Sequence, residues 1–143
     1  MAEQRAQRRA CLIDARTDGS KTDNMRRRLI ALYAELAALT EPECGACARP
    51  YSCCEARYCA LAIDFAREHW GVELRPTWHP TLPLMGPAGC TAAPHLRPIC
   101  TAHTCETNEH GCKRGDEAWT GRYAALRGAI DEIEAEVLPA GAI

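Results

Sequence analysis

Apolar side chains recur at helical spacing in three stretches of this 143-residue chain. The spacing predicts helices over about residues 22–40, 54–70 and 116–138. The first helix should end before Pro42, because proline disfavours helical backbone in the residue that precedes it, and the second should end at Gly71. In the third helix the apolar residues alternate at steps of four and three, as in a heptad seam: Trp119, Tyr123, Leu126, Ile130, Ile133 and Val137.

The heptad seam of the third helix requires an apolar partner, and the first helix is the natural one. If the two helices pack antiparallel, Arg26–Arg28 would lie near three acidic residues of the third helix, which are Glu132, Glu134 and Glu136. The same seam could instead serve a protein partner or self-association through the 116–138 helix. The sequence leaves both uses open.

The remaining segments are less regular. Residues 1–21 are polar and contain the turn signal Asp18-Gly19-Ser20, so we predict an N-terminal arm or short helix there. Residues 72–101 are rich in proline and should be mostly irregular. The predicted fold class is therefore mainly α: residues 22–143 form a single metal-stabilised domain of about three helices with long irregular cysteine-rich loops, and residues 44–112 form its metal-binding region.

Composition explains why a metal is expected. Aromatic residues make up 6% of the chain and phenylalanine occurs once, so large core-filling side chains are scarce. A small domain with a thin core commonly needs disulfides or a metal. Nine of the ten cysteines lie between Cys44 and Cys112, and no secretory signal precedes them. We therefore expect a cytoplasmic protein with a metal site rather than a disulfide framework. No apolar run is long enough to span a membrane.

The cysteines fall into two groups separated by the proline-rich stretch. Zinc and iron–sulfur centres each take about four thiolate or imidazole ligands. Nine cysteines could therefore complete one site with spares, or two sites. Cys59 and His103 are further candidates: Cys59 is equally compatible with burial, and His103 in C-T-A-H-T-C could join a mixed site, whereas Cys11 reads as a small buried residue. The candidate metal ligands are Cys44, Cys47, Cys53, Cys54, Cys90, Cys100, Cys105 and Cys112.

These motifs resemble the YkgJ-type cysteine-cluster family, a zinc- or iron-chelating domain. The resemblance covers residues 44–122 and rests on C-x2-C followed by C-C, on Arg97-Pro98-Ile99-Cys100 after Cys90, and on Cys112 at the start of the last helix. It implies zinc or iron, including a [4Fe-4S] cluster, since the family is similar to the cysteine-rich part of flagellin lysine methylases. It also implies that Arg97 neutralises a thiolate-rich cluster.

The leading functional hypothesis is a small intracellular metal-binding protein whose metal is mainly structural or serves a partner assembly. Alternatives are an iron–sulfur redox or methyl-transfer accessory protein, and a zinc-stabilised adaptor for protein or nucleic acid. The formal net charge of −2 argues against nucleic acid. We identify no catalytic residues, because the chain has neither a glycine-rich cofactor loop nor paired acids in a recognisable site, so we lean against an enzyme.

Overall fold

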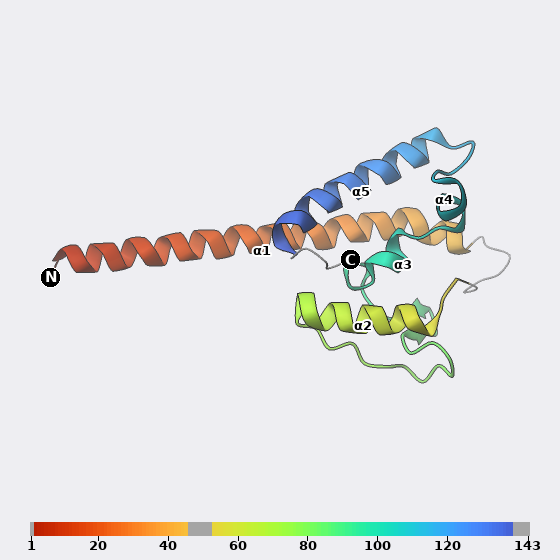
Figure 1. The fold of residues 1–143 in the computed structure, drawn as a ribbon, viewed down its shortest axis with the longest axis horizontal. Helices are drawn as coiled ribbons and strands as arrows, with labels where there is room; N and C mark the ends of the chain where they lie inside the picture. The colour runs from red at the N-terminus through yellow and green to blue at the C-terminus, as the bar shows by residue number, and fades with distance from the viewer. Residues whose placement is uncertain (1, 46–52, 139–143) are drawn as a thin grey trace.

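The computed structural model describes residues 2–45 and 53–138, with side chains from 21 to 44 and from 53 to 138. The fold is mainly helical, as the sequence predicts. Figure 1 shows three long helices joined by a compact irregular region. In chain order the elements are α1 (Ala2–Gly45), α2 (Ala56–Trp70), strands β1 (Met85–Gly86) and β2 (Gly89–Cys90), the 3-10 helix η1 (Pro94–Leu96), α3 (Pro98–Ala102), α4 (Cys105–His110) and α5 (Glu117–Val137).

Helices α1 and α5 run antiparallel and carry the main core (Figure 1). Leu29 and Leu36 of α1 and Ile130 of α5 are at most 2% exposed, and Phe65 of α2 joins the same cluster. The predicted pairing of the two helices is therefore confirmed. Leu126 and Ile130 of the α5 seam are buried within the chain. Association with another molecule through the 116–138 helix stays a prediction.

The sequence also predicts that Arg26–Arg28 lie near three acidic residues of α5, and Arg26 does reach that end of the helix, because its Nη2 donates to the Val137 carbonyl over 3.4 Å. Among the residues with described side chains, no ion pair joins Arg26–Arg28 to Glu132, Glu134 or Glu136. Arg26 instead donates to the backbone oxygen of His69 over 2.9 Å, and its guanidinium lies over the Trp70 ring. A backbone carbonyl and an aromatic face are both favourable partners for a guanidinium, so Arg26 is satisfied here without a carboxylate.

The limits of α1 also differ from the prediction. The helix begins at Ala2, passes through Asp18-Gly19-Ser20 without a turn and contains Pro42. One glycine costs a helix interior only about 1 kcal/mol, so it does not force a break. Near Pro42, tertiary contacts hold the last turns: the buried Thr40 donates to the Thr101 carbonyl over 2.8 Å, and the Trp119 indole donates to the Leu39 carbonyl over 3.2 Å. The division into an arm (1–21) and a domain (22–143) remains a prediction.

The other two long helices match their predictions. Helix α2 ends at Gly71, whose φ of 62° is left-handed, and Val72 N–H donates to the Ala66 carbonyl, as in a Schellman cap. Helix α5 begins after Asp116, whose carboxylate accepts from Trp119 N–H. The region between them contains short elements that periodicity did not predict, namely the two-residue strands, η1, α3 and α4.

A second, smaller apolar cluster lies beside the first half of α2. Its buried members are Ala62 of α2, Leu84 before β1 and Ala92 after β2, and Cys59 packs against them. Two alanines and one leucine bury little apolar surface compared with the α1–α5 core. The cysteine-rich half of the molecule therefore depends on other sources of order.

Replacing Leu36 with alanine tests the α1–α5 core. Leu36 is fully buried, so Leu36→Ala should lower the free energy of unfolding by about 2–5 kcal/mol. Ile30→Ala on the same helix is the control, since Ile30 is 39% exposed and should change stability by less than about 1 kcal/mol. Urea unfolding followed by circular dichroism measures both, and equal losses in the two variants would contradict this core.

The buried pair Tyr33–Glu134 gives the fold a pH dependence. Tyr33 O–H donates to Glu134 Oε1, while Glu134 Oε2 has no hydrogen-bond partner. Burial raises the pKa of Glu134, Asp131 adds to the rise, and the bond from Tyr33 and the charge of Arg127 oppose it. A raised carboxyl pKa stabilises the fold below the unfolded pKa, near 4.3, and that contribution is lost as pH rises through the folded pKa.

Glu134→Gln should remove that loss of stability. The free energy of unfolding of the variant minus that of the wild type should rise between about pH 4 and pH 7. Urea titrations at intervals of pH measure it, with Glu132→Gln on the exposed face of α5 as the control. A difference that stays constant with pH would show that the Glu134 carboxyl titrates alike in the folded and unfolded chains.

Candidate metal centre

Two neighbouring short helices position an imidazole and a thiol side by side. Helix α3 ends at His103 and α4 begins with Cys105, with Thr104 between them as the N-cap of α4. The backbone of His103 and Thr104 is extended, so the side chains of residues 103 and 105 point to one side and Thr104 to the other. Thr104 is buried, and its hydroxyl accepts from Thr107 N–H over 3.1 Å. The buried threonine thus turns His103 and Cys105 outward together.

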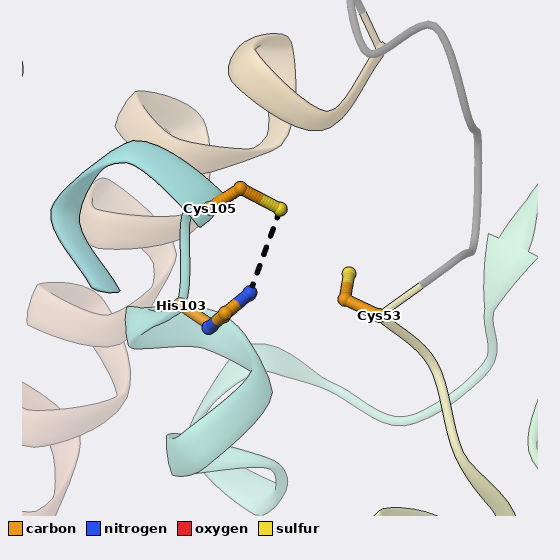
Figure 2. Close-up of side chains that lie close together, drawn as sticks. All are labelled: Cys53, His103 and Cys105. Atoms are coloured by element: carbon orange, nitrogen blue, oxygen red, sulfur yellow. Dashed lines mark hydrogen bonds between the residues drawn. The ribbon is translucent and has the colours of Figure 1, made fainter. Parts of the chain in front are cut away.

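Cys53 faces this pair from the segment that leads into α2 (Figure 2). The His103 Nε2 and Cys105 Sγ atoms lie 3.9 Å apart. One ligand atom from each of Cys53, His103 and Cys105 lies within 4.8 Å of the other two. Two sulfurs bound to one zinc at about 2.3 Å each are separated by about 3.8 Å, so small side-chain movements would bring these three atoms to ligand distance.

Cys54 and Cys100 are two thiols whose ionisation the fold disfavours. Both residues keep solvent-exposed surface, yet burial of the sulfur is the largest cause of a raised thiol pKa in each. The pKa of Cys54 rises to about 11, and the charges of Cys53, Cys100, Cys59 and Cys90 add to that rise. For Cys100 the cysteines at 90, 59 and 53 act in the same direction. Burial and the charge of other thiolates thus both oppose ionisation of these two thiols.

Arg97 supplies positive charge to the same region. Its side chain is 12% exposed, its Nε donates to the Ala92 carbonyl over 2.9 Å, and its Nη2 contacts Glu41 Oε1 at 3.0 Å. Arg97 lowers the pKa of Cys100 against the larger effect of burial. Pro98 follows it at the first position of α3, where its fixed φ suits a helix start. The predicted role of Arg97 near thiolates is compatible with this placement.

The structure does not bring all predicted ligands together. Cys53 and Cys105 belong to the group with His103, whereas among the described residues no such group of ligand atoms includes Cys54, Cys90 or Cys100. Cys44 is exposed at the end of α1 and Cys112 is half-buried before α5. Cys47 lies outside the described residues.

Two residues that were not among the predicted ligands, His103 and Cys59, need a description of their own. His103 joins the group, and its signal was the C-T-A-H-T-C spacing, which predicted a mixed site as an alternative. Cys59 lies on the first turn of α2 and packs against the small apolar cluster of Ala62, Leu84 and Ala92. Its position on the apolar face of a helix made burial an equal alternative.

A cavity of about 330 Å³ borders His103 between α1, α3, α4 and α5. Its polar walls are largely engaged within the protein, because Tyr33 donates to Glu134 and Tyr123 O–H donates to the Ala102 carbonyl over 2.7 Å. Tyr123 also stacks on Trp119. These contacts fasten α5 to α1 and α3, and so they hold the His103 segment in place.

Comparisons of the chain with protein-family models, with curated proteins and with solved structures return no match. The resemblance to the YkgJ-type family therefore stays a prediction. Within the described part of the chain, the helices are too short or too polar to cross a membrane.

The charge of Arg97 can be tested through the reactivity of Cys100. In reduced, metal-free protein, Arg97→Gln should slow alkylation of Cys100 at pH 8 about two- to fivefold, the change in thiolate population for a charge interaction of about 0.5–1 kcal/mol. Glu41→Gln removes the ion pair but keeps the arginine, so it should leave the rate unchanged or raise it. Peptide mass spectrometry follows the rates, and equal slowing in both variants would indicate a loss of local structure instead.

Proposed function

We propose that this chain is a zinc-binding protein whose metal mainly stabilises the cysteine-rich half of the fold. The observation that carries the proposal is the convergence of Cys53, His103 and Cys105. Two thiolates and one imidazole are ligands that zinc binds in tetrahedral mixed sites. Iron–sulfur clusters are held mostly by thiolates alone, so the imidazole favours zinc at this position.

The fourth ligand in this proposal comes from the end of α1 or the start of α5. Lys113 Nζ contacts Glu43 Oε1 at 2.7 Å, and this ion pair joins the end of α1 to the segment just before α5. Cys44 and Cys112 are the sequence neighbours of that ion pair. Either thiolate would complete a tetrahedral set of three cysteines and one histidine.

A metal at this centre would have a structural role, because it would connect segments that lie far apart in the sequence. Cys53 lies before α2, and His103 and Cys105 lie between α3 and α5, about fifty residues later. A metal bound to all three closes that loop and restricts the unfolded chain. Because the nearby apolar cluster consists of Ala62, Leu84 and Ala92, the binding free energy would supply much of the local folding free energy.

Metal analysis of wild-type protein purified without oxygen tests this proposal. We expect a colourless protein with bound zinc, and we expect chelation at neutral pH to lower the melting temperature and reduce the helical signal. His103→Ala and Cys105→Ala should each weaken zinc binding at this centre by at least about a hundredfold, since loss of an outer partner alone costs about 10- to 100-fold.

His79→Ala is the matched control for the histidine variant. His79 is exposed in the loop between α2 and β1, where its Nδ1 accepts from the backbone of Thr81 and Leu82. This variant should bind zinc as the wild type does. A folded wild-type protein without metal would refute the proposal, and unchanged affinity in His103→Ala would remove the imidazole from it.

A further inference from the structure

The cavity between α1, α3, α4 and α5 has the size of a small-molecule site. Its volume of about 330 Å³ falls at the lower end of the range of such sites, which is about 300–1,000 Å³. Of the candidate metal group, His103 lines the cavity, whereas Cys53 and Cys105 do not. The cavity is therefore a separate site that shares one wall with the candidate metal centre.

One wall of the cavity contains a polar atom that the protein leaves unpaired. Glu134 of α5 lines the cavity and is 6% exposed. Tyr33 O–H donates to its Oε1, whereas Oε2 is buried and has no hydrogen-bond partner. An unpaired buried carboxylate oxygen is destabilising. Because the last side-chain torsion of glutamate is broad, a small rotation presents this oxygen to a hydrogen-bond donor that enters the cavity.

The charged side chains around the cavity leave one negative charge in excess. Asp131 and Glu134 are acidic, and Arg127 is the one arginine or lysine among the described lining residues. Arg127 is turned toward Tyr123: its Nη1 donates to the phenol oxygen over 3.3 Å, and its guanidinium lies 5.9 Å from the ring centre. Among the side chains that the structure describes, no salt bridge joins Arg127 to either acid. With both carboxylates ionised and His103 neutral, a ligand with one positive charge would balance the lining.

The remaining walls offer apolar surface to the same ligand. Ile99 of α3 lines the cavity and is 45% exposed, and Ile130 of α5 lines it as well. Pro98 and Ala102 extend the apolar lining along α3. An alkyl chain in the cavity would remove part of the Ile99 surface from water. The lining thus combines an apolar wall with an unpaired carboxylate oxygen.

We propose that this cavity binds a small primary alkylammonium ion, whose ammonium group donates to Glu134 and whose alkyl chain lies against Ile99 and Ile130. Asp131 adds a second negative charge near the ammonium group. Binding is non-covalent, and no proton or electron is transferred. The inference goes beyond the proposed function and does not depend on a bound metal, because Glu134, Asp131 and the apolar walls are not ligands of the candidate metal centre.

An organic cation fits this lining better than a metal ion or an anion. Hard metal ions such as Ca²⁺ take six to eight oxygen ligands, and Glu134 and Asp131 are the two carboxylates that line the cavity. Neither belongs to the described group whose ligand atoms converge as for a metal. An anion would meet two acidic side chains and one arginine that is already engaged with Tyr123. An ammonium group needs a single charged acceptor and gains from the apolar wall.

Titration of the full-length wild-type protein with three ligands of similar size tests the charge preference. The probes are butylammonium, butan-1-ol and butyrate at pH 8, where an alkylammonium ion stays protonated. We expect butylammonium to shift the backbone amide resonances of Ala102, Asn108 and Ile130 saturably, with roughly millimolar affinity for so small a ligand. Butanol and butyrate should bind at least about tenfold more weakly, since a hydrogen bond to a charged group is lost in each. Equal affinity for butanol, or no saturable shift with butylammonium, would overturn the proposal.

Variants of α5 test the role of Glu134 in the same titration. Glu134→Gln keeps the shape of the side chain but removes its charge, so it should weaken butylammonium binding about 10- to 100-fold. Asp131→Asn should weaken it about two- to fivefold, as expected for an exposed charge. Glu132→Gln is the matched control, because Glu132 is exposed and does not line the cavity, and it should leave the affinity unchanged.

Unchanged affinity in Glu134→Gln would also overturn the proposal. If Glu134→Gln does not fold, the comparison of the three ligands in the wild type carries the test without it. A wild-type protein that lacks metal but binds butylammonium would refute the proposed function and support this inference. A zinc-loaded wild type that binds none of the three probes would have the opposite meaning.

Discussion

The packing of α5 against α1 is the interaction on which the rest of this structure depends. It buries Leu29, Leu36 and Ile130 almost completely and takes in Phe65 from α2. No other described part of the chain offers a comparable apolar surface. The segments that carry the cysteines are short, and two of them are helices of five and six residues that would not be stable alone. These short segments are ordered because they pack and hydrogen-bond against α1 and α5.

Polar contacts from the end of α1 make that attachment. Thr40 binds the Thr101 carbonyl, Glu41 pairs with Arg97, and Glu43 pairs with Lys113. Thr101 in turn donates to the Pro94 carbonyl over 2.7 Å, which connects α3 to η1. Of these contacts, the bond from Thr40 to the Thr101 carbonyl is buried, and leaving one partner of such a bond unpaired costs about 1–3 kcal/mol. Together the contacts therefore specify where α3 and α4 lie, and so where His103 and Cys105 face.

The long helices could be predicted from the sequence because their apolar periodicity and their stop signals agree. Gly71 ends α2 and Asp116 begins α5, as local rules require. The end of α1 could not be predicted, because Pro42 is a local stop signal and the contacts of Thr40 and Leu39 that override it come from residues more than sixty positions away. Local propensity carries no information about such partners.

The sequence predicted the chemistry of the candidate site, but it could not predict which cysteines lie together. Cysteine density and spacing indicated a metal, and the C-T-A-H-T-C motif included His103 as an option. Spacing alone could not separate Cys53 from Cys54, since adjacent residues satisfy the same motif. Their separation depends on how the chain enters α2 and on what faces it across space, which is set by α3 and α4. Cys59 was ambiguous because a half-buried cysteine on a helix satisfies both packing and ligation.

These features divide the molecule into two halves with different sources of stability. The α1–α5 half is held by apolar burial, which remains whether or not a metal is bound. The cysteine-rich half buries few large apolar side chains: its small cluster is Ala62, Leu84 and Ala92, and Leu96 is buried in η1. Burial also raises the pKa of the Cys54 and Cys100 thiols. A metal that replaced the thiol protons would overcome that resistance, because the thiolates would share one cation. Under the proposed function, metal ligation would take the place of the large apolar side chains that this half of the molecule lacks.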